Sequence, residues 1–447
     1  MPNATIRSRG SMEDVLLRCG AFAASLGRIP SGLRIRLRAQ LVAVVAASLS
    51  ADQRDVTAWA RRSTGPHPLL GFSHGVARME SIVAGVARAA GAEWGLLGRA
   101  GAPAIVAALS LGAAAGKTLE EVELAQAAAV ELALRFGLAT MLGPHIFDDA
   151  PCVAAVAGAV ASGRILGLDA RQMANAIASA MTESSALDGV IAAEHAFESA
   201  GRNASPSFAF APAAFARLGD AWLARTVQIN AHSAPASAQS AIDGTREVLA
   251  QARVVRRTVP ANQVRSLEVE SSIFGASLQS RPRLIAAIAQ TGVPVETIRV
   301  RHAWDLTSTI LFRVAETIDA RTHFKDVASL PLRLARVAQS VGLGTPPVTQ
   351  LAADATRLLR LRSGAFDPQP FSLGNRVLLT MTDGQRFAAD RSDPPAVSDE
   401  RALGIARARL LTVATARFGA RRAERLFEAI ARPRAGMLAS ELVAMMR

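Results

Sequence analysis

The chain has 447 residues, half of them hydrophobic and only 4% aromatic, with no tyrosine, so its core must be built mainly from Ala, Leu, Val and Ile side chains. The formal charge of +13 comes mostly from scattered arginines, Lys117 and Lys325 being the only lysines, and with few aromatic stacking partners we expect no nucleic-acid partner. Two cysteines are too few for a disulfide framework, and neither an apolar signal segment nor a membrane span of about 20 residues is present, so we expect a cytoplasmic protein with no membrane partner.

The first part of the chain, to about residue 250, has helical patterns almost throughout. Residues 33–50 place apolar side chains at helical spacings, with arginines on the other face. The sequence TLEE at 118–121 is a capping box that predicts a helix start, and Gly167 and Asp169 predict the break between two further helices. We therefore expect an all-helical domain over residues 1–255.

The pattern changes near Pro260. Alternating side chains predict strands at 264–272 and 296–304, and RVLLTMTDGQRFAAD at 376–390 predicts a hairpin that turns at its Asp-Gly pair. Helical segments lie between the strands, near residues 282–291, 330–341 and 347–358. These elements predict an α+β domain over residues 256–395.

A last helical stretch covers residues 399–447 and carries a wide apolar face. Such a face favours packing back on the first domain, so we expect residues 396–447 to complete the helical domain. The predicted fold class is mainly α with an inserted α+β domain.

Five segments, spread over most of the chain, resemble the MmgE/PrpD family in their order and spacing. They are GAPAIVAALSLG, GRILGLDARQMANAIASAMTESSAL, SAGRNAS, SLPLRLARVA and RVLLTMTDGQRF. The family includes 2-methylcitrate dehydratase, cis-aconitate decarboxylase and an iminodisuccinate epimerase. The resemblance implies the MmgE/PrpD-like two-domain architecture, a homodimer, and a lyase of dehydratase or decarboxylase type, or an isomerase, that abstracts a proton from a small di- or tricarboxylic acid.

The polar positions of that family are largely replaced in this chain. Its acidic cluster falls on Glu93 and the two residues after it, and the histidine of its GHP motif falls on Ala102. A second histidine falls near Asp148, a third becomes Ser199, and a lysine becomes Val327. These replacements support an alternative: a catalytically inactive, diverged member that binds a small acid or pairs with an active paralogue.

The segment LGPHIFDDAPC interrupts two small-residue helices, and we expect a pocket at this break. His145 lies three and four positions before Asp148 and Asp149, so an imidazole and a carboxylate there could form an acid/base pair. The alternative is that His145 contacts the last carbonyls of one helix while an aspartate caps the next.

A second candidate set lies in TESSALDGVIAAEHAFESAGRNAS. Glu194 or His195 could act as the base, while the Arg202 guanidinium could bind a carboxylate with two parallel hydrogen bonds. Alternatively, Glu198 and Arg202 form an ordinary helix surface pair. The substrate-binding candidates of this segment are Ser184, Glu198 and Asn203.

His232 precedes a predicted helix start, where free N–H groups could bind an anionic substrate, or it is simply an exposed loop histidine. Cys152 opens an alanine-rich helix and is expected to be a core residue rather than a nucleophile. No histidine or cysteine spacing resembles a metal site, and no glycine-rich phosphate loop follows a strand, so we expect neither a metal nor a cofactor.

Overall fold

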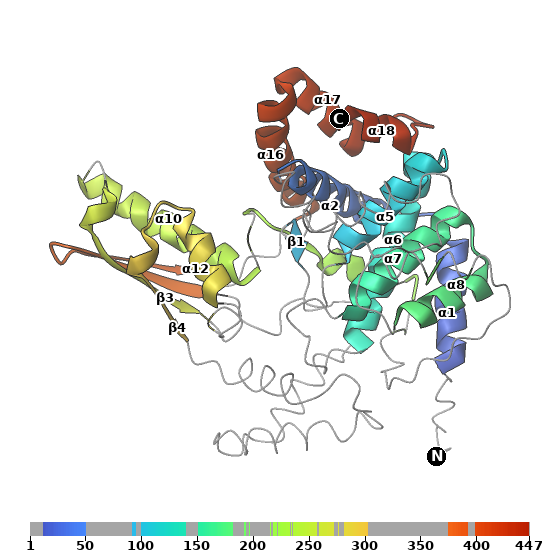
Figure 1. Ribbon diagram of the computed structural model, residues 1–447, viewed down its shortest axis with the longest axis horizontal. Coiled ribbons are helices and arrows are strands. Elements are labelled where there is room, and N and C mark those ends of the chain that lie inside the picture. Colours follow the sequence, from blue (N-terminus) through green and yellow to red (C-terminus); the bar gives the residue numbers. More distant parts are fainter. Residues whose placement is uncertain are drawn as a thin grey trace, which may run out of the picture.

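The computed structural model has two separate apolar cores, one among helices and one against a small sheet. Figure 1 shows the helices and the sheet that surround them. It describes residues 12–50, 92–94, 100–139, 151–181, 218–220, 222–232, 236–256, 259–271, 281–302, 374–391 and 398–446, and the single residues Ala192, Ala193, Ala196, Phe215, Ala234 and Ala276. Within these residues, no helix combines the length and the apolar character needed to cross a membrane.

The larger core lies between alanine-rich helices that approach each other closely. They are α1 (Met12–Ser25), α2 (Ser31–Ser50), α5 (Gly101–Ala114), α6 (Leu119–Ala139), α7 (Pro151–Leu166) and α8 (Ala170–Ala180). Gly20 of α1 lies so near α8 that a Cβ at this position would collide with the carbonyl oxygen of Ala170. Small side chains thus set the distance between these helices, as the composition predicts.

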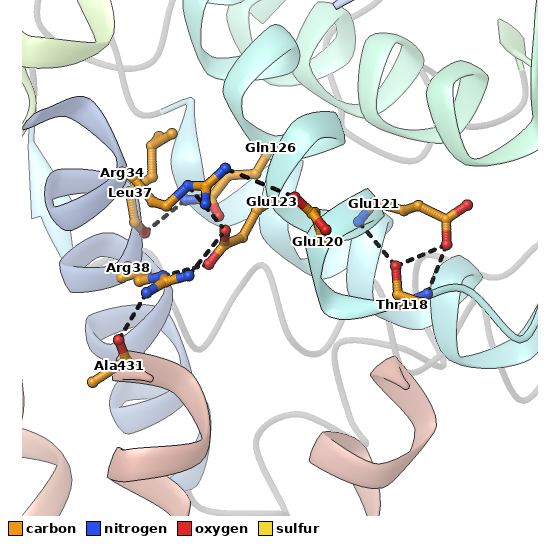
Figure 2. A network of polar contacts seen from close by, with 9 residues as sticks. All are labelled: Arg34, Leu37, Arg38, Thr118, Glu120, Glu121, Glu123, Gln126 and Ala431. Carbon is orange, nitrogen blue, oxygen red and sulfur yellow. Dashed lines mark hydrogen bonds and ion pairs between the residues drawn. The ribbon is translucent and has the colours of Figure 1, made fainter. Parts of the chain in front are cut away.

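The predicted helix boundaries of this body are confirmed by their hydrogen bonds. At the start of α6 the Thr118 amide donates to the Glu121 carboxylate at 2.8 Å, and the Glu121 amide donates to Thr118 Oγ1 at 3.3 Å (Figure 2). Between α7 and α8, Gly167 has a φ of +77°, and the Asp169 carboxylate accepts from two amides of the first turn of α8. Both junctions satisfy N–H groups that a helix start leaves without partners.

The C-terminal helices pack on the same core. They are α16 (Asp399–Phe418), α17 (Ala420–Ala431) and α18 (Ala439–Met445). Helix α16 packs along α2 through a buried row spaced by four residues, namely Ala402, Ala406, Leu410 and Ala414. Helix α2 therefore lies between α16 and the rest of the helical body.

Polar contacts add to this packing along α2 (Figure 2). Arg38 Nε lies 2.5 Å from the Glu123 carboxylate of α6, and Arg38 Nη1 donates to the carbonyl of Ala431 in α17 at 3.0 Å. Gln126 of α6 donates to the carbonyl of Leu37 at 2.9 Å. One face of α2 is thus joined to both the N-terminal and the C-terminal helices.

The second core lies on one face of a four-stranded mixed sheet with the order β4-β3-β5-β6. The strands are β3 (Val264–Ser271), β4 (Ile298–His302), β5 (Asn375–Met381) and β6 (Arg386–Arg391). Strands β3 and β4 are parallel, whereas the other two pairs are antiparallel. The predicted hairpin is confirmed: it turns at Asp383 and Gly384, where Gly384 has a φ of +90°.

Two helices, α10 (Ala236–Arg256) and α12 (Arg281–Ala289), cover the buried face of this sheet (Figure 1). The sequence pattern placed α10 within the helical domain, yet its apolar side chains lie in the second core. The core changes between Ile229, which belongs to the first cluster, and Ala234, which belongs to the second. The predicted helices at 330–341 and 347–358, and the predicted pocket at 144–152, lie largely or wholly outside the described residues.

Candidate functional site

His232 is the one predicted site residue whose surroundings the structure describes. The remaining candidates lie outside the described residues, so their roles stay predictions: His145, Asp148, Ser184, Glu194, His195, Glu198, Arg202 and Asn203. The side chain of Cys152 also lies outside the description, although the predicted helix that it opens is present as α7.

His232 lies just before α10, and its side chain is only 13% exposed. Its Nε2 atom lies 2.7 Å from Oδ1 of Asp243, which projects from α10. The interpretation of His232 as an exposed loop histidine is therefore wrong. The second turn of the following helix supplies a carboxylate partner for the ring.

Arg246, one turn further along α10, approaches the other ring nitrogen. Its Nη1 atom lies 3.4 Å from Nδ1 of His232. Because a guanidinium can only donate, this contact makes Nδ1 the acceptor and leaves the proton on Nε2, where it is donated to Asp243. The two contacts thus fit the tautomer that carries its proton on Nε2, where the N–H points at a carboxylate.

Asp243 is held as a carboxylate. Partial burial raises the pKa of Asp243, but the hydrogen bond from His232 and the positive charges of Arg391 and Arg246 lower this pKa below its ordinary value of 3.8. A carboxylate that accepts the N–H of a histidine fixes both the tautomer and the orientation of the ring.

The backbone around His232 is fixed by side chains as well. We define the His232 segment as the described residues Asn230, Ala231, His232 and Ala234. Gln239 of α10 accepts from the His232 amide at 2.9 Å and donates to the carbonyls of His232 at 3.1 Å and Ala234 at 2.8 Å. The Asn230 side chain donates to the Ala234 carbonyl at 3.2 Å. The segment is therefore a hydrogen-bonded turn rather than an open loop.

A short ribbon precedes this segment. Strand β2 (Gln228–Ile229) pairs antiparallel with β1 (Glu93–Trp94), and the Asn230 amide donates to the carbonyl of Ala92 at 3.1 Å. The ribbon thus brings the segment around Glu93 next to the His232 segment, although more than a hundred residues separate them in sequence.

Glu93 is buried, and its carboxylate occupies the N-terminus of α5. Oε1 accepts from the amides of Gly101 at 2.6 Å and Ala102 at 3.2 Å, and Oε2 accepts from the side chain of Gln40. A carboxylate is stabilised at this end of a helix by the amide dipoles. The resemblance assigned the family's acidic cluster to Glu93 and its GHP histidine to Ala102, so these two positions are in contact, but here they form a helix cap.

Arg135 and Glu131 form a buried ion pair in the helical core. Arg135 Nε lies 2.6 Å from Glu131 Oε1, both side chains are fully buried on α6, and Glu131 Oε2 accepts from the Ala224 amide at 3.0 Å. Burial raises the pKa of Glu131 against the lowering effect of Arg135. The pair connects α6 to the 3₁₀ turn Leu223–Thr226.

Three residues of α10 contact the ring or the backbone of His232, and we call them, with His232, the His232 cluster. Sequence reasoning missed these three residues, although their spacing along the helix indicates that they share a face. Gln239, Asp243 and Arg246 are spaced by four and three residues, so a helix places them along one face. The His232 segment, just before the helix, folds back onto that face. The sequence gives no sign of this turn.

Neither the known family models nor the curated proteins contain a match to the chain. Among the described residues, no group of three His, Cys, Asp or Glu side chains is placed to hold a metal ion. What the His232 cluster can do must follow from its own groups: an imidazole oriented by a carboxylate, with an arginine at the other ring nitrogen.

Proposed function

We propose that this protein is a lyase, or an isomerase using the same proton abstraction, that acts on a small di- or tricarboxylic acid with His232 as the base. The proposal is supported mainly by the contact of 2.7 Å between His232 Nε2 and Asp243. A histidine whose N–H is donated to a carboxylate presents the lone pair of its other nitrogen as a proton acceptor. Here that acceptor is Nδ1.

Arg246 provides the second element of the chemistry. Its guanidinium is exposed and borders Nδ1 at 3.4 Å, so a substrate carboxylate bound to Arg246 would hold its α-carbon near the base. Guanidinium groups bind carboxylates through two parallel hydrogen bonds. The substrate would replace the weak contact between Arg246 and the ring, freeing the Nδ1 lone pair.

The reaction then proceeds by transfer of the α-proton to His232. The C–H bond breaks, an N–H bond forms at Nδ1, and the electron pair remains on the substrate as an enolate stabilised by Arg246. Asp243 stabilises the imidazolium that results. In elimination, the electron pair of the enolate forms a C=C bond as the bond from the β-carbon to oxygen breaks, and the proton leaves with the hydroxyl as water. In isomerisation, the proton is returned to the opposite face of the α-carbon.

The proposal includes membership of the MmgE/PrpD family, with the homodimeric assembly that the resemblance implies and the cytoplasmic location that the composition favours. The order of helical body, α+β module and returning C-terminal helices supports it. The contact between Glu93 and Ala102 supports it further, because the resemblance places two family site segments at these positions. Glu194, His195 and Arg202 remain predicted catalytic residues, and Glu194 or His195 is the alternative base.

Solvent exchange tests the reaction. The purified protein is incubated in deuterium oxide with citrate-like, aconitate-like and iminodiacid compounds, and deuterium in each acid is measured by mass spectrometry. We expect His232→Gln and Asp243→Asn to reduce exchange by about 100-fold or more, as for loss of a general base. The matched control is His302→Gln, which changes a histidine of β4.

Two results would contradict this assignment at different levels. Full exchange with the His232→Gln variant would show that His232 is not the base. His195 and Glu194 would then be tested as the base. If the unaltered protein catalyses no exchange in any of these acids, the proposal that it is an enzyme of this kind is wrong.

One observation favours the second candidate function, a diverged member without catalysis. The Glu93 carboxylate, which stands at the family's acidic position, is fully engaged at the start of α5. In that case the same acids bind without exchange. Calorimetric titration of unaltered protein and an Arg246→Gln variant separates the two functions, because binding without deuterium uptake supports only the second.

A further inference from the structure

We infer that Arg409 and Gln239 are positioning residues that hold His232 from two sides, one from each core. The expected effect on catalysis rests on the proposed function. The effect on the imidazole itself does not, because it can be measured in the resting protein.

Arg409 holds the segment from the helical body. It projects from α16, and its Nη1 donates to the carbonyls of Asn230 at 2.7 Å and Ala92 at 3.4 Å. These carbonyls belong to the residues that flank the β1–β2 ribbon. Partial burial lowers the pKa of Arg409, yet a guanidinium remains charged, and a partly buried cation is stabilised by such acceptors.

Gln239 holds the segment from the other core. Its amide forms hydrogen bonds with both the N–H and the carbonyl of His232, and it reaches the Ala234 carbonyl as well. Gln239 and Asp243 lie one turn apart on α10. The helix that orients the imidazole therefore also fixes the backbone that carries it.

The two contacts together locate His232 between the cores. Asn230, whose carbonyl accepts from Arg409, lies two residues before His232. Ala234, whose carbonyl accepts from Gln239, lies two residues after His232. If either contact is lost, the backbone can shift and the imidazole can leave the plane of Asp243. Displacements of about 1 Å in a reacting group can lower a rate by about 100-fold.

The experiment compares Arg409→Gln and Gln239→Met with the unaltered protein. The matched control is Arg407→Gln, which removes an arginine of the same helix together with its contacts to Glu424 and Phe427. The nitrogen resonances of the His232 imidazole report the tautomer and titration of the ring, and steady-state kinetics separate kcat from KM.

We expect both variants to shift the His232 resonances towards a mixture of tautomers and to lower kcat by about 10- to 100-fold, with little change in KM. Arg409→Lys, which keeps a cationic donor, restores part of both signals. Arg407→Gln behaves as the unaltered protein.

Folded variants with unchanged imidazole resonances would overturn the inference. If Arg409→Gln does not fold, Gln239→Met decides by the same measurements. If His232→Gln retains activity, the proposed function fails, whereas the imidazole resonances still determine whether Arg409 and Gln239 position the ring.

Discussion

Asp243 shows how one carboxylate can depend on several neighbours. It accepts from His232, and the positive charges of Arg246 and Arg391 lower its pKa further, while partial burial acts in the opposite direction. Arg391 also forms an ion pair with Glu247 on α10. The residues that orient the imidazole are therefore linked to the packing of α10 on β6.

The depressed pKa of Asp243 makes a testable contribution to stability. A carboxyl whose pKa is lower in the folded than in the unfolded state stabilises the fold above its ordinary pKa of 3.8 and loses this contribution as the pH falls through the folded value. We expect Asp243→Asn to be less stable than the unaltered protein at about pH 5 and the difference to shrink towards about pH 3. Urea unfolding at both values measures it.

Asp220→Asn controls for the loss of one exposed negative charge. A difference in unfolding free energy between Asp243→Asn and the unaltered protein that stays constant from about pH 5 to about pH 3 would contradict the role assigned to His232 and the two arginines.

At this scale the sequence predicted local partners better than distant ones. The contact between Thr118 and Glu121 follows from spacing alone, because a capping box lies within one helical turn, and the helix break at Gly167 and Asp169 was predicted from the same kind of local signal. The contact between Glu93 and Gly101 depends on how a connecting segment returns to the helix start. The hydrogen bond from Arg409 to the Asn230 carbonyl joins residues far apart in the chain, and no local pattern indicates it.

Among the elements, the close approach of α1 and α8 depends on a single missing side chain. A Cβ at Gly20 would collide with the backbone of Ala170 and lie 2.9 Å from the amide of Ala174. Backbone atoms cannot move aside as a flexible side chain can. The two helices must therefore separate if any larger residue replaces Gly20.

Gly20→Ala and Gly404→Ala form a matched pair of helix substitutions. We expect Gly20→Ala to destabilise the protein by about 1–3 kcal/mol through overpacking, although alanine is the better helix former. A Cβ at Gly404 of α16 meets nothing within 4 Å, so Gly404→Ala should stabilise by about 1 kcal/mol. Thermal and urea unfolding of both variants measure the difference, and a stabilised Gly20→Ala variant would contradict the close packing.

Element types followed from periodicity, whereas their pairing did not. Strands were predicted at 264–272 and 296–304, and the structure has them at 264–271 and 298–302; these strands and the Asp-Gly hairpin were found because alternation and turn residues are local signals. The parallel pairing of β3 with β4, and the packing of α10 on the sheet, depend on contacts between distant segments. A helical pattern shows that a helix forms, but not which core it covers.

On the scale of the molecule, the helical core is completed by segments from both ends of the described chain. Helices α16, α17 and α18 pack on α2 and α5, and Arg36 of α2 forms an ion pair with Asp399 at 2.8 Å. Within the described part of the chain, the second core is built from residues between Ala234 and Ala389. The helical core therefore requires both the N-terminal and the C-terminal helices, whereas the second core is formed by one internal stretch.

Removal of residues 398–447 tests this dependence. The deletion uncovers the α2 surface that α16 buries, and we expect the shortened protein to bind a hydrophobic dye strongly and to aggregate on size-exclusion chromatography. Removal of residues 439–447 alone, which takes only α18, serves as the control and should leave most of the protein folded. A monomeric, dye-free product of the longer deletion would contradict the packing of α16 on α2.

The position of α16 also determines the order in which the chain can acquire its structure during synthesis. Helix α2 leaves the ribosome long before α16 has been translated, so the apolar row that it presents to α16 stays uncovered while the whole intervening sequence is made. The sheet with α10 and α12 can assemble in that interval, since all its segments precede residue 392. We therefore expect the nascent N-terminal helices to be prone to aggregation until α16 has been made, because their apolar surface stays exposed until then.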